Sequence, residues 1–276
     1  MTRITVRGVE LEVASAGSGD RGRALLLHGF GGAKEDFTDW LDPLAAEGWQ
    51  AVAYDQRGHG QSAHPEGEEA FSLDIFKQDL LAVVDELGWD RFVLLGHSMG
   101  GMVAQLAAAA APARLAGLVL MDTSHGPIDG LDLSLVTMGQ QVVREGGIPA
   151  LLAAQKAMGP GPLDSPAHLR LVADRRGYQE FCDAKTLAMS APMWLAMSGE
   201  MVAETDRLPE LETLSMPVLV LVGEEDNGFL GPSRAMASAI PGARLVVLPG
   251  AGHSPQFEAP DSWGQAVLAF LSEVST

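Results

Sequence analysis

The sequence predicts an α/β fold in which helices flank a mostly parallel sheet and a helical cap is inserted into the chain. First, apolar runs typical of buried strands alternate with segments of helical periodicity up to residue 122, a rhythm that indicates parallel βαβ units. Second, a Gly-x-Ser-x-Gly turn at 96–100 separates one such run from a helical segment. Third, the rhythm stops over residues 123–213 and resumes afterwards. We therefore expect a core formed by residues 1–122 and 214–276, with residues 123–213 as the cap.

The composition is that of a globular protein with little affinity for nucleic acid. The chain has 276 residues, 47% of them hydrophobic, and a formal net charge of −18. This charge disfavours nucleic acid and anionic membrane surfaces, which attract clusters of Lys and Arg. The single cysteine, Cys182, excludes an intrachain disulfide. Because the sequence shows no signal peptide and no apolar stretch of transmembrane length, we expect a cytoplasmic protein, either a monomer or a homodimer.

The N-terminal residues 2–15 are predicted to form an antiparallel hairpin. Apolar and polar residues alternate along this segment, and Arg7-Gly8 stands in its middle as the turn. The glycine-rich segment 17–22 formally matches a dinucleotide-binding fingerprint. That fingerprint must open a helix, whereas this segment leads into the apolar run 24–27. We interpret it as a flexible turn, and we expect no cofactor.

The run 24–27 is the first expected parallel strand, and it ends in the glycine-rich turn at 28–32. A helix at about 36–47 and a strand at 51–54 should follow. The next loop, 55–62, contains Asp and Arg side chains that fix a turn by charge-assisted hydrogen bonds, so we interpret it as structural.

The central motif lies between the strand that begins at Phe92 and the small-residue helix that begins at Met99. Helical periodicity over 72–87 leads into this strand, which ends in Gly96-His97-Ser98-Met99-Gly100. The order of strand, Gly-x-Ser-x-Gly turn and helix is that of a nucleophile elbow, which exposes the serine hydroxyl above the sheet. Glycines at 96 and 100 allow strand and helix to cross closely. Ser98 is therefore the candidate nucleophile.

The segment after the strand 117–122 is predicted to be helical, and it contains six of the twelve methionines. Met189, Met193, Met197 and Met201 are spaced to lie on one face of a helix that Pro192 could start. Such a face either roofs a substrate pocket or packs ordinarily against the core. We name as candidate substrate-binding residues four members of this segment: His125, Met193, Trp194 and Met197.

The two strands near the C-terminus, 218–222 and 244–248, are each followed by a candidate partner for Ser98. Asp226 lies in the loop after the first, and His253, alone among the seven histidines, follows the second. Acyl transfer by a serine needs such a base and a carboxylate that orients it. Asp122, at the end of the strand 117–122, is the alternative acid.

The other ionisable residues near these positions are given lesser roles. The neighbouring Glu224 and Glu225 are expected to face solvent. The remaining histidines are interpreted as parts of glycine-containing turns (His28, His59, His97) or as solvated (His64, His168). The chain has neither a His-Glu-x-x-His motif nor paired cysteines, so we expect no metal.

Together these motifs resemble the α/β-hydrolase superfamily, in its compact, capped serine-hydrolase branch. That branch includes carboxylesterases, meta-cleavage-product hydrolases, enol-lactonases and haloperoxidase-type esterases. The resemblance covers nearly the whole chain except the cap, and it implies an eight-stranded sheet. It implies the order Ser98, Asp226, His253 for the catalytic triad. It also implies an oxyanion hole formed by the backbone N–H groups of Phe30, in the turn at 28–32, and Met99.

The function that the resemblance implies is hydrolysis of a small, neutral, largely hydrophobic carboxylic ester through an acyl-enzyme. Ser98, where related epoxide hydrolases and haloalkane dehalogenases carry Asp, argues against those two activities. The alternatives are hydrolysis of a carbon–carbon bond in a meta-cleavage product, or of an (enol-)lactone, by the same triad. A ligand receptor built on a hydrolase scaffold is a third alternative.

Overall fold

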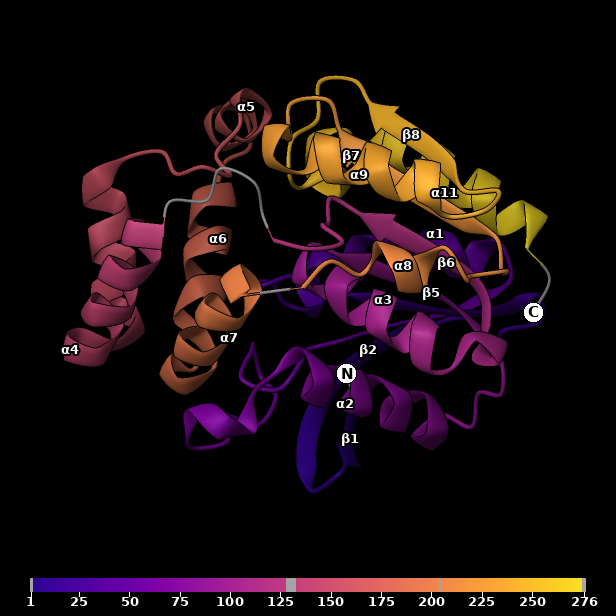
Figure 1. Cartoon of the computed structure of the whole chain (residues 1–276), viewed down its shortest axis with the longest axis horizontal. Helices are drawn as coiled ribbons and strands as arrows, with labels where there is room; N and C mark the ends of the chain where they lie inside the picture. The colour runs from indigo at the N-terminus through magenta and orange to yellow at the C-terminus, as the bar shows by residue number, and fades with distance from the viewer. Residues whose placement is uncertain (1, 128–132, 204, 275–276) are drawn as a thin grey trace.

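The computed structural model describes residues 2–127, 133–203 and 205–274, and its centre is one eight-stranded sheet with the order β1-β2-β4-β3-β5-β6-β7-β8 (Figure 1). The β1–β2 and β2–β4 pairs are antiparallel, and all other neighbours are parallel. This confirms the predicted fold class. The strands are β1 (Thr2–Val6), β2 (Val9–Ala16), β3 (Gly22–Leu27), β4 (Trp49–Tyr54), β5 (Phe92–His97), β6 (Leu115–Met121), β7 (Val218–Gly223) and β8 (Arg244–Leu248).

Helices cover both faces of this sheet. One apolar cluster unites side chains of α2, α3, α8 and α9 with one face, and a second unites α1 and α11 with the other. The α-helices are α1 (Thr38–Ala46), α2 (Leu73–Glu86), α3 (Met99–Ala110), α4 (Leu133–Met158), α5 (Pro166–Asp174), α6 (Tyr178–Leu187), α7 (Ala191–Ala203), α8 (Leu208–Leu211), α9 (Asn227–Ala239), α10 (Pro255–Glu258) and α11 (Pro260–Glu273). Short 3₁₀ helices span Lys34–Asp36, Glu68–Ala70 and Pro112–Arg114.

The central strands are apolar throughout because both faces of the sheet are covered. Successive residues of β5 alternate between the two clusters: Leu94 lies in the first, whereas Val93 and Leu95 lie in the second. This alternation is the two-residue period of a strand. All residues of β5, β6 and β7 are buried, as expected for parallel strands. Their carboxyl ends meet at one edge of the sheet, where the candidate site lies.

The predicted N-terminal hairpin is confirmed. Strands β1 and β2 pair in antiparallel register from Thr2↔Val13 to Val6↔Val9. The two turn residues, Arg7 and Gly8, have φ values of 48° and 81°. Positive φ at both central positions matches the twist of the flanking strands and gives a tight two-residue turn.

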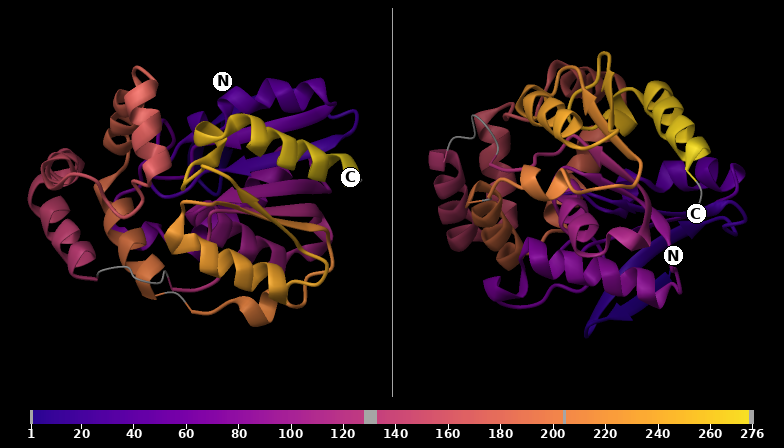
Figure 2. Two further views of the ribbon diagram at one scale, coloured as in Figure 1. Left: turned by 90° about the horizontal axis from the view of Figure 1, so that it is seen from above. Right: turned by 45° about the vertical axis from the view of Figure 1, so that its right-hand side comes forward.

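Between β6 and β7 the described residues form helices and no strand. Helices α4 to α7 lie together at one side of the sheet (Figures 1 and 2), whereas α8 packs on α3 and α9. The division of the chain at residues 122 and 213 stays a prediction. The expectation that Met189 shares a helix face with the three later methionines is wrong, because α7 begins only at Ala191. None of the helices in the described ranges has the length and apolar character needed to cross a bilayer.

Candidate active site

Ser98 stands in a sharp turn between β5 and α3. Its φ of 53° and ψ of −121° are values that a non-glycine residue rarely adopts. A Cβ added at Gly96 would lie 2.4 Å from the carbonyl oxygen of Gly100, and one added at Gly100 would lie 2.5 Å from that of His28. The two glycines are therefore required by close backbone crossings, as the sequence indicated. The turn leaves Ser98 partly exposed while its neighbours are buried.

A chain of hydrogen bonds links Ser98 to His253 and Asp226. The Nε2 atom of His253 lies 3.1 Å from the Ser98 hydroxyl oxygen, and its Nδ1 atom lies 2.8 Å from Oδ2 of Asp226. His253 is 9% exposed and Asp226 is 5% exposed. The structure thus brings together the three residues that the sequence nominated, which follow β5, β7 and β8. This is the geometry of a nucleophile, a base and an orienting acid.

The imidazole of His253 is held between two other rings. The Phe229 ring lies 4.7 Å from it and the His97 ring 5.0 Å, measured between centroids. His97 Nε2 also donates a hydrogen bond of 2.7 Å to the backbone carbonyl of His253. Burial, and secondly the neighbouring His253, lower the pKa of His97 to about 3, so His97 is a neutral donor. Ring and backbone of His253 are both fixed.

The glycine-rich turn after β3 passes directly against Ser98. A Cβ at Gly29 would lie only 2.8 Å from the Ser98 Cβ. Neither the N–H of Phe30 nor that of Met99 donates a hydrogen bond to any described residue. Among the described residues, therefore, neither N–H has an acceptor: one belongs to the turn and the other to the first residue of α3. Unpaired backbone N–H groups are what an oxyanion hole requires, and the assignment of these two to it stays a prediction.

The loop 55–62 is hydrogen-bonded to this turn. The Gln56 N–H donates to Nε2 of His28 at 3.0 Å, and the Gln56 side-chain amide donates to the His28 carbonyl at 2.8 Å. Asp55 pairs with the fully buried Lys34 at 3.0 Å, and Arg57 binds Asp79 with two donors. The loop is held by charge-assisted hydrogen bonds, as its composition indicated.

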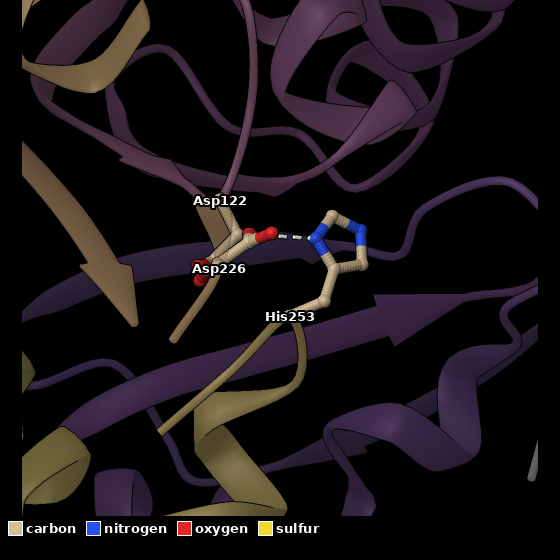
Figure 3. Close-up of side chains that lie close together, drawn as sticks. All are labelled: Asp122, Asp226 and His253. Atoms are coloured by element: carbon tan, nitrogen blue, oxygen red, sulfur yellow. Dashed lines mark hydrogen bonds and ion pairs between the residues drawn. The ribbon is translucent and has the colours of Figure 1, made fainter. Parts of the chain in front are cut away.

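A second carboxyl group lies beside the Asp226–His253 pair. Asp122, the first residue after β6, is fully buried, and Figure 3 shows its carboxyl group next to that of Asp226. One donor atom from each of Asp122, Asp226 and His253 lies within 4.8 Å of the others, a spacing that could also hold a metal ion. The direct His253–Asp226 hydrogen bond explains this grouping without an ion, and we assign none.

The four predicted substrate-binding residues have different surroundings. His125 pairs with Asp206, its Nδ1 atom lying 2.8 Å from Oδ1 of that residue. Trp194 lies over the turn, with its ring centroid 6.0 Å from that of Phe30. Met193 and Met197 are fully buried in the apolar cluster shared with α2 and α3. Contact of any of these four residues with substrate stays a prediction.

Two residues expected to be solvated are instead partly buried. Glu225 accepts hydrogen bonds from the Ala167 N–H at 2.6 Å and from Arg170 at 2.8 Å. It thereby ties the N-terminus of α5 to the loop that carries Asp226. The His168 side chain is 19% exposed, with its ring 5.9 Å from that of Tyr178. Both expectations failed because helix α5 covers this loop, which periodicity alone does not reveal.

Sequence reasoning also missed residues that hold the site. Phe229 belongs to no motif that the sequence analysis recognised. His97 was interpreted only as part of a glycine-containing turn, not as a contact of His253. Glu258 accepts the N–H groups of Gly252 and Ser254, on either side of His253, at 2.6 and 3.2 Å. Its position five residues after His253, at the end of a short Pro-initiated helix, was the one local signal available.

Residues 25–260 match the alpha/beta hydrolase fold family. That match covers most of the chain, so the protein belongs to the alpha/beta hydrolase family, which confirms the resemblance. The chain is 27% identical to 3-oxoadipate enol-lactonase 2 of Acinetobacter baylyi over 282 residues, covering 97% of this chain and 95% of that one.

Two solved structures show the same fold along the whole chain. A thermophilic esterase from Thermogutta terrifontis is 28% identical, with a TM-score of 0.79 and full coverage of both chains. The enol-lactonase from Burkholderia xenovorans LB400 is 24% identical, with a TM-score of 0.85, covering 98% of this chain and 100% of that one. At this level of identity the second likeness concerns the fold alone.

Proposed function

We propose that the protein is a serine hydrolase that cleaves small, neutral, largely hydrophobic carboxylic esters through an acyl-enzyme. The observation that carries the proposal is the hydrogen-bonded path from the Ser98 hydroxyl through His253 to Asp226. The whole-length likeness to an esterase supports the class of reaction. Ser98, Asp226 and His253 are the proposed catalytic triad.

In the first half of the reaction, His253 Nε2 takes the Ser98 proton while the Ser98 oxygen attacks the ester carbonyl carbon. The N–H groups of Phe30 and Met99 stabilise the tetrahedral oxyanion, each by about 3 kcal/mol in comparable sites. The imidazolium then gives its proton to the alcohol oxygen as the carbon–oxygen bond breaks. Asp226 holds Nδ1–H and stabilises the transient cation.

In the second half, His253 takes a proton from water while the water oxygen attacks the acyl carbon of the Ser98 ester. The second tetrahedral oxyanion is held by the same two N–H groups. Its collapse breaks the bond to Ser98, which recovers its proton from His253, and the carboxylic acid leaves. Every proton taken by the imidazole is thus returned within the cycle.

The apolar character of the proposed substrate follows from the side chains near Ser98. The rings of Phe30, in the turn at 28–32, and Trp194 lie 6.0 Å apart between centroids, at an angle of 39° to each other. The Met189 sulfur would lie 3.5 Å from a Cβ at Gly31, in the same turn. A methionine and two aromatic rings favour an apolar acyl group of adaptable shape.

The test is steady-state hydrolysis of p-nitrophenyl esters from acetyl to hexanoyl by the wild type, Ser98→Ala and a matched control. Ser238→Ala is a suitable control because Ser238 is exposed on α9. We expect Ser98→Ala to lose at least about 10⁴-fold in kcat, and the control to keep wild-type rates. Wild-type turnover in Ser98→Ala would overturn the proposal.

A second candidate is hydrolysis of an enol-lactone, or of a carbon–carbon bond, by the same triad. The likeness to 3-oxoadipate enol-lactonase 2 over nearly the whole chain favours the lactone. Ring opening of lactones by a protein that is inert on simple esters would select this candidate. Tight ligand binding without turnover of either class would select a receptor instead.

A further inference from the structure

The Asp122 carboxyl group is fixed to the end of β7, the strand before the loop that carries the proposed triad acid. Strands β6 and β7 are parallel neighbours, and beyond their last paired residues the Asp122 N–H donates to the Leu221 carbonyl at 2.9 Å. Asp122 Oδ1 accepts the N–H of Gly223 at 2.8 Å. Asp122 itself has a φ of 44°, so the chain holds it in a conformation uncommon for a non-glycine residue.

The second oxygen, Oδ2 of Asp122, is buried and receives no hydrogen bond from any described donor. The Asp226 carboxyl group lies beside that of Asp122 (Figure 3), with one oxygen atom of each within 4.8 Å. Two carboxylates cannot both remain ionised in contact in a buried site, because their repulsion is poorly screened there. One of the two carboxyl groups is therefore expected to hold a proton.

The surrounding groups decide which of the two carries that proton. Asp226 faces the Nδ1 atom of His253, which becomes cationic during the proposed reaction, so its negative charge is stabilised. Asp122 receives one neutral backbone donor, the N–H of Gly223, and Glu258 of α10 adds another acidic group nearby. The His253 imidazole also lies near Asp122, but its Nδ1 atom bonds to Asp226. Burial, and next the charge of Asp226, raise the pKa of Asp122 well above its ordinary value.

We propose that Asp122 is a positioning residue whose carboxyl group keeps its proton in the folded protein and donates it in a hydrogen bond to the Asp226 carboxylate. This bond occupies the side of Asp226 that does not face His253 and holds the carboxylate in line with Nδ1. A carboxylic acid kept neutral by an apolar surrounding is a known hydrogen-bond donor in active sites. The inference rests on the proposed function only where activity is the readout.

The first experiment compares the pH–rate profiles of Asp122→Asn, Asp122→Leu and the wild type. Asn is the neutral equivalent of the protonated acid: its amide donates to Asp226 and its oxygen accepts from Gly223. We expect Asp122→Asn to keep kcat within about threefold, with the acidic limb of the profile unmoved. Asp122→Leu removes the donor and should lose about 10- to 100-fold.

Two results of this comparison would overturn the proposal. If Asp122 were ionised, Asp122→Asn would remove a negative charge beside His253, and the acidic limb would move to lower pH. If Asp122→Leu kept wild-type rates, Asp122 would not position Asp226. Circular dichroism of each variant shows whether it folds. If Asp122→Leu does not fold, the pH–rate profile of Asp122→Asn alone tests the proposal.

The second experiment needs no substrate, so its failure differs from failure of the proposed function. Free energies of unfolding in urea are measured for the wild type and Asp122→Asn from pH 3 to pH 8. A proton held by folded Asp122 is released on unfolding above about pH 3.9, which favours the unfolded wild type as the pH rises. We expect the stability of the Asn variant relative to the wild type to increase over this range. A relative stability that falls with rising pH would overturn the proposal.

Discussion

The His97 ring donates a hydrogen bond of 2.7 Å from Nε2 to the backbone carbonyl of His253, which joins the residue before Ser98 to the proposed base. His97 ends β5 and His253 follows β8, two strands that are not neighbours in the sheet. The bond therefore ties the end of β5 to the loop after β8, two segments that no direct strand pairing joins.

We expect His97→Phe to lower kcat by about 10-fold, as the loss of a bond that orients a site residue does. Phe keeps the ring shape but cannot donate to the His253 carbonyl, which is left unsatisfied. The comparison is ester hydrolysis by this variant and by His64→Phe, whose histidine is exposed. Equal rates for both variants would show that the His97 bond does not position His253.

We expect His97 to lower the stability of the folded protein as the pH falls from about 6.5 to about 3. In the folded protein, burial lowers the pKa of His97 to about 3. Below about pH 6.5, His97 therefore binds a proton in the unfolded chain but not in the folded chain, so acid favours unfolding. Urea unfolding of the wild type and His97→Phe over this range checks the sign. The variant should lose less stability on acidification, and a steeper loss would contradict the account.

The choice between the two candidate acids has a direct kinetic test. Asp226→Asn should lower kcat by about 10⁴-fold, because the amide favours the wrong imidazole tautomer and cannot stabilise the cation. Asp122→Asn should keep most of the activity. The reverse order of losses would make Asp122 the triad acid.

In the ion pair between Lys185 of α6 and Asp36, before α1, the Asp36 side chain is buried and that of Lys185 is 16% exposed. Lys185→Met leaves Asp36 buried without its cation, and we expect a loss of about 3 kcal/mol in the free energy of unfolding. Lys156→Met is the matched control, because the Lys156 side chain is 52% exposed in its pair with Asp183. That control should lose less than about 1 kcal/mol. Equal losses in urea would contradict the argument that burial of Asp36 makes the first pair the costlier one to break.

The fold was predictable because its signals are local. Apolar runs of strand length, the Gly-x-Ser-x-Gly turn and the break after Asp122 each lie within a short stretch of sequence. Ser98, Asp226 and His253 were also nominated from local signals, since each lies in the turn or loop after a strand and parallel strands end at one edge.

The supporting contacts were not predictable, because they join distant segments. His97 and His253 are 156 positions apart, and no periodicity relates them. The capping of α5 by Glu225 depends on how the helices between β6 and β7 lie over the sheet. The expected four-methionine face failed for another reason: Met189 precedes α7, because the helix starts at Ala191, beside the Pro192 that suits a first turn.

The central claim, that Ser98 is an activated nucleophile, is tested most directly by mass spectrometry after exposure to a fluorophosphonate. We expect one adduct, mapped to Ser98, in the wild type and in Ser238→Ala, and none in Ser98→Ala. An unlabelled wild type, or an adduct that persists in Ser98→Ala, would contradict the account.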